Sequence, residues 1–123
     1  MNAVILHIPR SCPFSPEALF LALGGYAITD SRYAAQTPIG NIYLDHYEDL
    51  LDEYEEQALT NLIKLIDEPR SYVLHWRGER ALEQFLRMIP EGIGAVVDNA
   101  NQVSYCLDYV RNLPIEEWLF CEN

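Results

Sequence analysis

Residues 45–57, DHYEDLLDEYEEQ, contain seven carboxylates, two tyrosines and a histidine but no lysine or arginine. Residues of these types are used by metal sites, by solvated helix faces and by surfaces that dock a basic protein. A metal site needs ligands that converge, as in an EF-hand loop or in Glu-x-x-His pairs repeated on facing helices. Neither pattern occurs here, so we predict no metal site and keep the other two interpretations.

The solvated-face interpretation depends on the helix that the following apolar residues predict. Apolar side chains recur at steps of three and four from residue 50 to residue 66, which is typical of one amphipathic helix. Asp45, Glu48 and Asp49 would then lie at the start of this helix, where its dipole stabilises each negative charge by about 0.3–1 kcal/mol. This effect accounts for three of the seven carboxylates.

The docking interpretation uses the carboxylates that the helix dipole does not explain. Tyrosines lie among them, and tyrosine gives a large contact area at a low loss of side-chain entropy. Such a surface can bind the Lys- and Arg-lined cleft of a nuclease or another basic protein, or it can imitate the backbone of a nucleic acid. The candidate contact residues, all expected to lie outside the apolar stripe of the helix or on its flanks, are Tyr47, Asp49, Asp52, Glu53 and Glu56.

No motif for nucleophilic, phosphate-binding or dinucleotide-binding chemistry occurs in the sequence, and the three cysteines lack a C-x-x-C spacing. We therefore predict a non-enzymatic protein with no catalytic residues and no cofactor. One alternative is a small enzyme or ligand-binding domain whose site is assembled from distant residues such as His7, His75 and Asp98. The arginines between residues 70 and 87 could bind an anion, although such residues more often pair with glutamates on a solvated helix face.

Composition and charge restrict the class of protein further. Half of the 123 residues are apolar and no linker or repeat divides the chain, so we expect a single domain over residues 1–123. The net charge of −11 argues against direct binding to nucleic acid, which depends on Lys and Arg. The chain has no apolar stretch of about 20 residues and no signal-peptide pattern, so we expect a cytoplasmic protein that does not bind membranes.

Hydrophobic periodicity and turn residues predict the elements that position these side chains. Strands are expected near residues 3–8, 26–30, 41–46, 71–76 and 93–98, and helices near 16–23, 50–66 and 78–88. Residues 102–107 fit either a further strand or the start of a short helix. The expected fold is a single-domain α/β or α+β protein with a mixed sheet of about five strands packed against three or four helices. The residues expected to be buried are Leu62, Val73, Leu82, Phe85 and Val96.

Residues 71–110, SYVLHWRGERALEQFLRMIPEGIGAVVDNANQVSYCLDYV, run from an expected strand through a helix to a second strand, an Asp-Asn turn and a further element. In this order, and in being small, acidic and without a catalytic motif, the chain resembles the small immunity proteins that bacteria make against their own secreted toxins. The resemblance implies a cytoplasmic inhibitor that masks the active site or a neighbouring surface of a toxin effector domain. It implies no catalytic residue in this chain.

Overall fold

The structure is a computed structural model and describes residues 2–122. The strands are β1 (Asn2–Pro9), β2 (Tyr26–Ala27), β3 (Arg32–Thr37), β4 (Gly40–His46), β5 (Pro69–Arg77), β6 (Val96–Asp98) and β7 (Ser104–Cys106). The α-helices are α1 (Pro16–Ala22), α2 (Glu56–Ile63), α3 (Glu79–Arg87) and α4 (Leu107–Val110), and two 3₁₀ turns are η1 (Leu50–Glu53) and η2 (Ile115–Glu117). The strands form one sheet in the order β2-β3-β4-β5-β1-β6-β7, in which every neighbouring pair is antiparallel. The fold class is therefore α+β.

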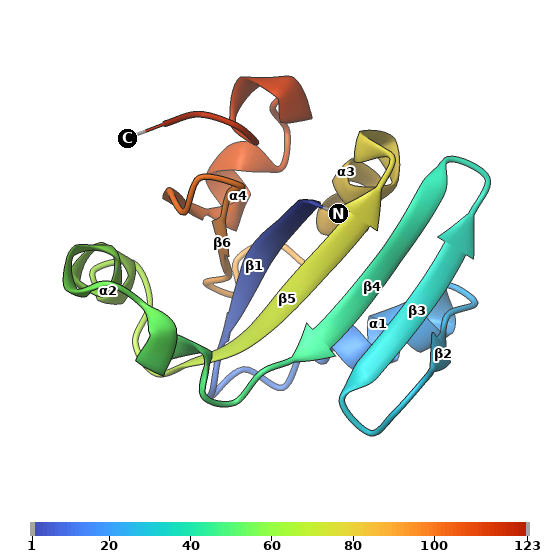
Figure 1. Ribbon diagram of the computed structural model, residues 1–123, viewed down its shortest axis with the longest axis horizontal. Coiled ribbons are helices and arrows are strands. Elements are labelled where there is room, and N and C mark those ends of the chain that lie inside the picture. Colours follow the sequence, from blue (N-terminus) through green and yellow to red (C-terminus); the bar gives the residue numbers. More distant parts are fainter. Residues whose placement is uncertain (1, 123) are drawn as a thin grey trace.

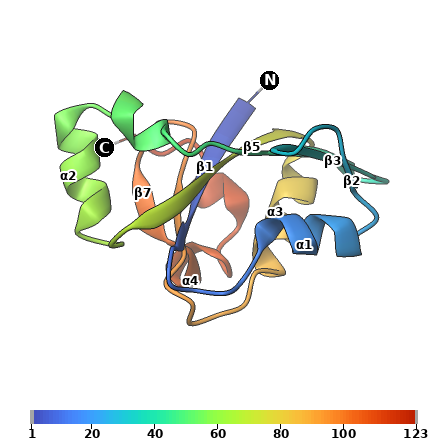
Figure 2. The ribbon, with the colours of Figure 1, turned by 90° about the horizontal axis from the view of Figure 1, so that it is seen from below.

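The helices are distributed unequally over the two faces of the sheet. α1, α3 and α4 lie on one face, and most of the buried apolar side chains fill the space between them and the strands (Figures 1 and 2). η1 and α2 lie at the β1, β6 and β7 end, where Leu62 packs against Val96 on the other face. No helix within residues 2–122 covers the remainder of that second face. The main core includes Val4, Leu6, Ile8, Phe20, Leu44, Leu74, Leu82, Phe85, Val97, Leu107 and Leu119.

Local signals in the sequence explain the two helices that cover the centre of the core. Ser15 caps α1, because its hydroxyl oxygen accepts a hydrogen bond from the backbone N–H of Ala18 at 3.1 Å. Gly24 follows α1 with φ of +88°, a left-handed conformation that glycine adopts without strain. The apolar side of α3 packs Phe85 edge-on against Phe20 of α1, with ring centroids 5.0 Å apart. These contacts join the two helices above the sheet.

The expected strands near 3–8, 41–46 and 71–76 and the helices near 16–23 and 78–88 are confirmed, but the sheet differs from the expectation. It has seven strands rather than about five, and it is antiparallel rather than mixed. The expected strand at 26–30 contracts to two residues and the one at 93–98 to three, and β3 occupies a segment in which no element was expected. In the sheet, β3 lies between β2 and β4. Residues 102–107 combine both expectations, because β7 leads directly into α4.

The single helix expected over residues 50–66 is wrong. The chain forms η1, then an extended break at Tyr54 and Glu55, and only then α2. One continuous helix would place Asp52 one turn from Glu55 and Glu56, and like charges at that spacing destabilise a helix. The break also lets the side chain of Tyr54 reach the sheet, where its hydroxyl donates to the carboxylate of Asp98.

Four of the five residues expected in the core are buried, but Val73 is only partly buried. Its neighbours Tyr72 and Leu74 point into the main core. Side chains alternate along a strand, so Val73 must face the opposite side of the sheet. In the described part of the chain, no helix covers that part of the second face.

Candidate protein-binding surface

The acidic segment, residues 45–57, runs from the end of β4 through η1 into the first turn of α2 (Figure 1). The backbone N–H of Tyr47 donates to the carbonyl of Ser71 at 3.1 Å, so the chain leaves the sheet beside β5. The segment then crosses to the far end of the sheet, near β6 and β7 (Figure 2). Its side chains therefore border the second face rather than the main core.

The structure places all five candidate contact residues on the surface; they are Tyr47, Asp49, Asp52, Glu53 and Glu56. Tyr47 exposes 42% of its area. A hydrogen bond to Glu53 and the negative charges of Glu53 and Asp49 raise the pKa of the Tyr47 phenol. Tyr47 is thus a protonated, exposed aromatic group among carboxylates. The part that these five residues play in binding stays a prediction.

Most of the charge of the acidic segment is not neutralised within the chain. Asp45 lies 3.3 Å from Arg32 and 3.5 Å from His75, and Glu48 lies 3.4 Å from His46. The other carboxylates of the segment form no ion pair with any residue in 2–122; they are Asp49, Asp52, Glu53, Glu55 and Glu56. Closely spaced charges of one sign attract a surface of the opposite sign.

A small second core attaches the acidic segment and α2 to the sheet. Leu62 of α2 and Ile66, which follows it, pack against Val96 of β6. Leu51 of η1 and Tyr54 are partly buried against the same three residues. The charged side of the segment is therefore backed by apolar contacts, and its side chains project from a packed base.

Beside this second core lies a network of buried polar side chains. Tyr54 donates its hydroxyl proton to one oxygen of the Asp98 carboxylate, and Ser104 donates to the other oxygen. His7 places Nε2 3.0 Å from Asp98 and 3.1 Å from the Tyr54 hydroxyl. The Nδ1 atom of His7 lies 2.8 Å from Oγ of Ser71. His7, Ser71 and Asp98 are all buried.

The network keeps one carboxylate charged inside the protein. Burial alone would raise the pKa of Asp98, but hydrogen bonds to His7, Ser104 and Tyr54 outweigh burial and lower it. Burial and the nearby Asp98 charge raise the pKa of the Tyr54 phenol, so the phenol keeps its proton and acts as a donor. Hydrogen bonds to an ionised group are about twice as strong as neutral ones. They fasten the break between η1 and α2 to β6.

Ser71, His7 and Asp98 are the residue types of a hydrolytic triad, but all three side chains are buried. A nucleophile must approach a reacting atom to about 3–3.5 Å. Ser71 is only 5% exposed, and none of the three main cavities within residues 2–122 is lined by Ser71, His7 or Asp98. The hydrogen bonds of the network join η1 and α2 to β1, β5 and β6.

The alternative site named from the sequence is only partly assembled. His7 and Asp98 meet, whereas His75 lies on the second face beside Asp45, at 3.5 Å. The sequence analysis missed Tyr54 as the third member of this contact. A signal was present, because a histidine and an aspartate in apolar strands need buried hydrogen-bond partners.

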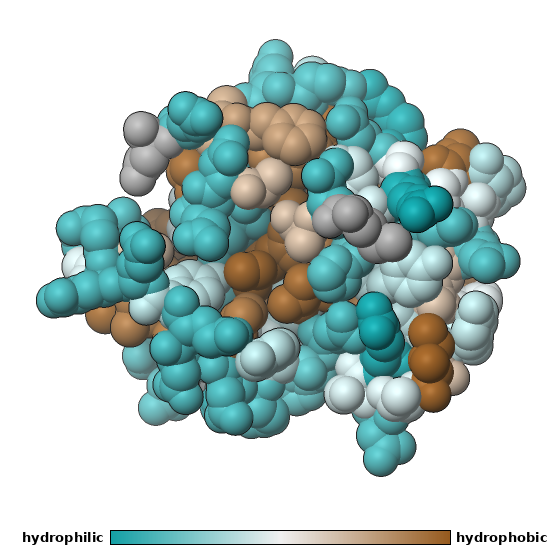
Figure 3. Space-filling model, in the orientation of Figure 1, coloured by the Kyte–Doolittle hydropathy of each residue, from teal (hydrophilic) through white to brown (hydrophobic). Residues whose placement is uncertain are grey.

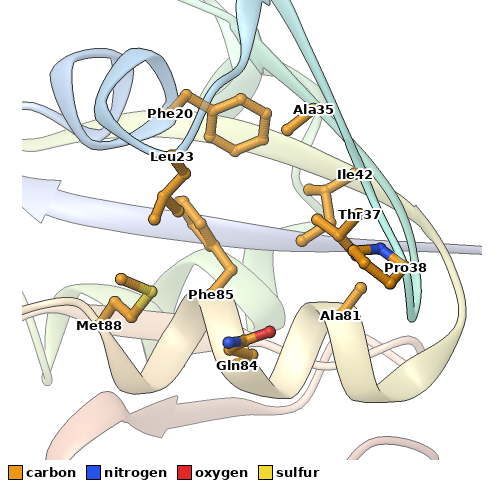
Figure 4. A pocket seen from close by; sticks show the side chains of 10 residues that line it. All are labelled: Phe20, Leu23, Ala35, Thr37, Pro38, Ile42, Ala81, Gln84, Phe85 and Met88. Carbon is orange, nitrogen blue, oxygen red and sulfur yellow. The ribbon is translucent and has the colours of Figure 1, made fainter.

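The most apolar cavity lies on the helix-covered side of the sheet, between α1, α3 and the β3–β4 hairpin (Figure 4). Its volume is about 220 Å³. The polar side chains that line it are Thr37 and Gln84, and the Thr37 hydroxyl already donates to the carbonyl of Gly40 at 2.7 Å. The cavity holds no acid, base or nucleophile.

The arginines between residues 70 and 87 do not converge on an anion site. Arg70 donates to two backbone carbonyls in the loop before α1, at 2.7 and 3.0 Å. Arg80 and Arg87 approach Glu83 at 2.9 and 3.5 Å on α3. Arg80 and Arg87 thus each form an ion pair with Glu83 on one face of α3.

No three metal-ligating side chains among residues 2–122 are grouped closely enough to hold a metal ion. None of the helices in the same range has the length and apolar character needed to cross a membrane. Comparisons of the chain with protein-family models, with curated proteins and with solved structures gave no match.

Proposed function

We propose that this chain is a non-enzymatic binding protein that neutralises a bacterial toxin, as immunity proteins do, by docking its acidic segment onto a basic surface of the toxin. One observation carries the proposal. Exposed carboxylates without ion-pair partners in residues 2–122 lie on a segment that is fixed to the sheet by buried hydrogen bonds. An acidic tail that was only solvated would not need this attachment.

Attachment to the sheet supports high affinity. A flexible acidic segment would lose backbone conformational entropy when it binds, at about 1–2 kcal/mol for each residue that becomes fixed. The second core and the Tyr54–Asp98 hydrogen bond already fix the backbone of this segment. Less entropy is therefore lost on binding, and more of the electrostatic attraction remains as affinity.

The charge also supports fast binding. Complementary charges steer two proteins together and raise the association rate well above that of neutral partners. A toxin must be blocked before it acts inside the cell that makes it, so rapid capture suits an inhibitor. This requirement and the exposed carboxylates point to the same kind of partner, a protein with a Lys- or Arg-rich active-site cleft.

The test begins with toxin-like proteins encoded beside the gene for this chain. Co-expression of the wild-type chain should restore growth to cells that produce the cognate toxin, and the two proteins should co-purify. The double variant Asp52→Lys/Glu53→Lys should then bind at least about 30-fold more weakly, which corresponds to about 2 kcal/mol. Failure of the wild-type chain to bind or protect against any such toxin would reject the function, whereas full affinity of the double variant would reject only the surface.

A further inference from the structure

The second face of the sheet carries an apolar strip next to the acidic segment. Ile5 of β1 and Val73 of β5 are directly opposite each other in the antiparallel register. Both side chains alternate with core residues, point away from α1, α3 and α4, and are partly exposed. Figure 3 shows apolar residues in the middle of this face, over β1 and β5, with hydrophilic residues around them.

Neighbouring strands extend the strip with aromatic and small side chains. Tyr43 of β4 lies opposite His75 of β5, and His75 lies opposite Ala3 of β1. A face of an antiparallel sheet that only meets water normally alternates to polar residues. On this face β5 also carries the polar residues Ser71 and His75, but Ile5 and Val73 meet at its centre, and an apolar pair there fits a surface that another molecule covers.

The strip and the acidic segment are continuous. Asp98 is the register partner of Ile5 on the side of β6, and Tyr54 of the acidic segment donates to its carboxylate. On the other side, Asp45 is the register partner of Val73. The Asp45 charge is offset by Arg32 at 3.3 Å, but the exposed carboxylates of η1 and α2 form no ion pair within residues 2–122.

We infer that the apolar strip, defined here as Ala3, Ile5, Val73 and Tyr43, is the centre of the same interface whose rim is the acidic segment. This inference rests on the proposed function. The occupant is a segment of the basic partner that places an apolar or aromatic side chain on Val73 and its lysines or arginines against η1 and α2. Interfaces commonly have this arrangement, with a desolvated apolar centre and a charged rim.

Charge complementarity selects this occupant over a second copy of the chain. Two copies that met through this face would bring two acidic segments together, each with unpaired carboxylates, in a protein of net charge −11. Like charges placed face to face across an interface oppose association. A cationic partner removes that repulsion and gains attraction instead.

The test uses two labelled, lysine-rich peptides of equal length and charge, one with lysine alternating with serine and one in which the central serine is tryptophan. Fluorescence anisotropy at low ionic strength measures their affinities. The wild-type chain should bind the tryptophan peptide at least about tenfold more tightly than the serine peptide. Val73→Lys should reduce this ratio to near one, and Val73→Thr, which preserves the shape of the side chain, should reduce it partly.

Gln36→Lys is the matched control, because Gln36 is exposed on the same face of β3 but lies away from the acidic segment; it should leave the ratio unchanged. Asp52→Lys/Glu53→Lys should lower the affinity for both peptides by the same factor. Equal affinity of the wild-type chain for the two peptides, or no binding of either, would show that the strip is not the centre of the interface. The proposed function would then still be decided by the toxin co-expression experiment. If Asp52→Lys/Glu53→Lys bound the peptides as tightly as wild type, both the acidic segment as a binding surface and this inference would be rejected. Dimerisation of the wild-type chain that Val73→Lys abolishes would identify a second copy as the occupant, against the inference.

Discussion

At the scale of single residues, the hydroxyl of Tyr54 links the exposed acidic segment to the interior. It donates to the Asp98 carboxylate and lies 3.1 Å from Nε2 of His7. The aromatic ring also belongs to the second core. One side chain therefore provides both apolar packing and a polar tie, and the two contributions can be separated by removing only the oxygen.

Tyr54→Phe should lower the free energy of unfolding by about 1.5–3 kcal/mol, because a hydrogen bond to a charged group is lost while the ring stays in place. Urea titration measures this loss. Tyr47→Phe is the matched control in the same segment. Its hydroxyl is exposed, so water can replace its hydrogen bond to Glu53, and the change should be below about 0.5 kcal/mol. Equal, small effects of the two substitutions would show that the buried tie does not stabilise the fold.

The Asp98 carboxylate gives the stability a defined dependence on pH. Hydrogen bonds hold the folded pKa of Asp98 below its ordinary value of 3.8, so its contribution is fully present above pH 3.8 and is lost as the pH falls through the folded pKa. Wild type should therefore be more stable than Asp98→Asn near neutral pH, and the difference should shrink below pH 3.8. Urea titrations of both proteins at several pH values check this; a difference that stays constant down to pH 2 would contradict the assigned pKa shift.

At the scale of elements, periodicity predicted α3 correctly, because Ala81, Leu82 and Phe85 form one apolar side and Pro90 limits the helix. The same kind of pattern misled over residues 50–66. Apolar residues do recur at helical spacing there. However, the Tyr54 hydroxyl donates to Asp98 in the sheet, and the backbone at Tyr54 is extended rather than helical. Contacts between residues far apart in the chain decided the break, and a local pattern does not contain them.

Phe85→Ala tests the element that was predicted correctly. Phe85 is buried and packs edge-on against Phe20, so its removal should lower the free energy of unfolding by about 3–5 kcal/mol through lost burial and a new cavity. Gln84→Ala is the control on the exposed side of the same helix, with an expected change below about 0.5 kcal/mol. A loss below about 1 kcal/mol for Phe85→Ala in denaturant titration would contradict the packing of α3.

At the scale of the whole molecule, the class and many elements followed from the sequence, but the arrangement of the sheet did not. The run SYVLHW of β5 alternates Ser71, Val73 and His75 with Tyr72, Leu74 and Trp76, and the second set faces the core. The expectation that Val73 is buried considered its apolar side chain and not its place in this alternation. Similarly, β3 contains alanines and polar residues that give little strand signal, and its pairing with β4 is visible only in the fold. The exposure of the five candidate contact residues agrees with the geometry that the docking hypothesis requires, while the buried network behind them needed the structure.

The net charge of −11 raises the question whether the total charge or its position governs association with a basic partner. Asp52→Lys/Glu53→Lys and Glu91→Lys/Glu117→Lys change the net charge equally, but Glu91 and Glu117 are exposed outside the acidic segment. Both variants should fold, because surface reversals away from packed contacts change stability by only about 0.5 kcal/mol or less.

In stopped-flow measurements with the cognate toxin, wild type should lose most of its association rate when ionic strength rises from about 0.05 to 0.5 M, because salt screens charges beyond a few ångströms. The Asp52/Glu53 variant should associate at least about tenfold more slowly at low salt and respond little to added salt, whereas the Glu91/Glu117 variant should stay close to wild type. Equal slowing of the two variants would mean that total charge steers the partner and that the acidic segment has no special position in the interface.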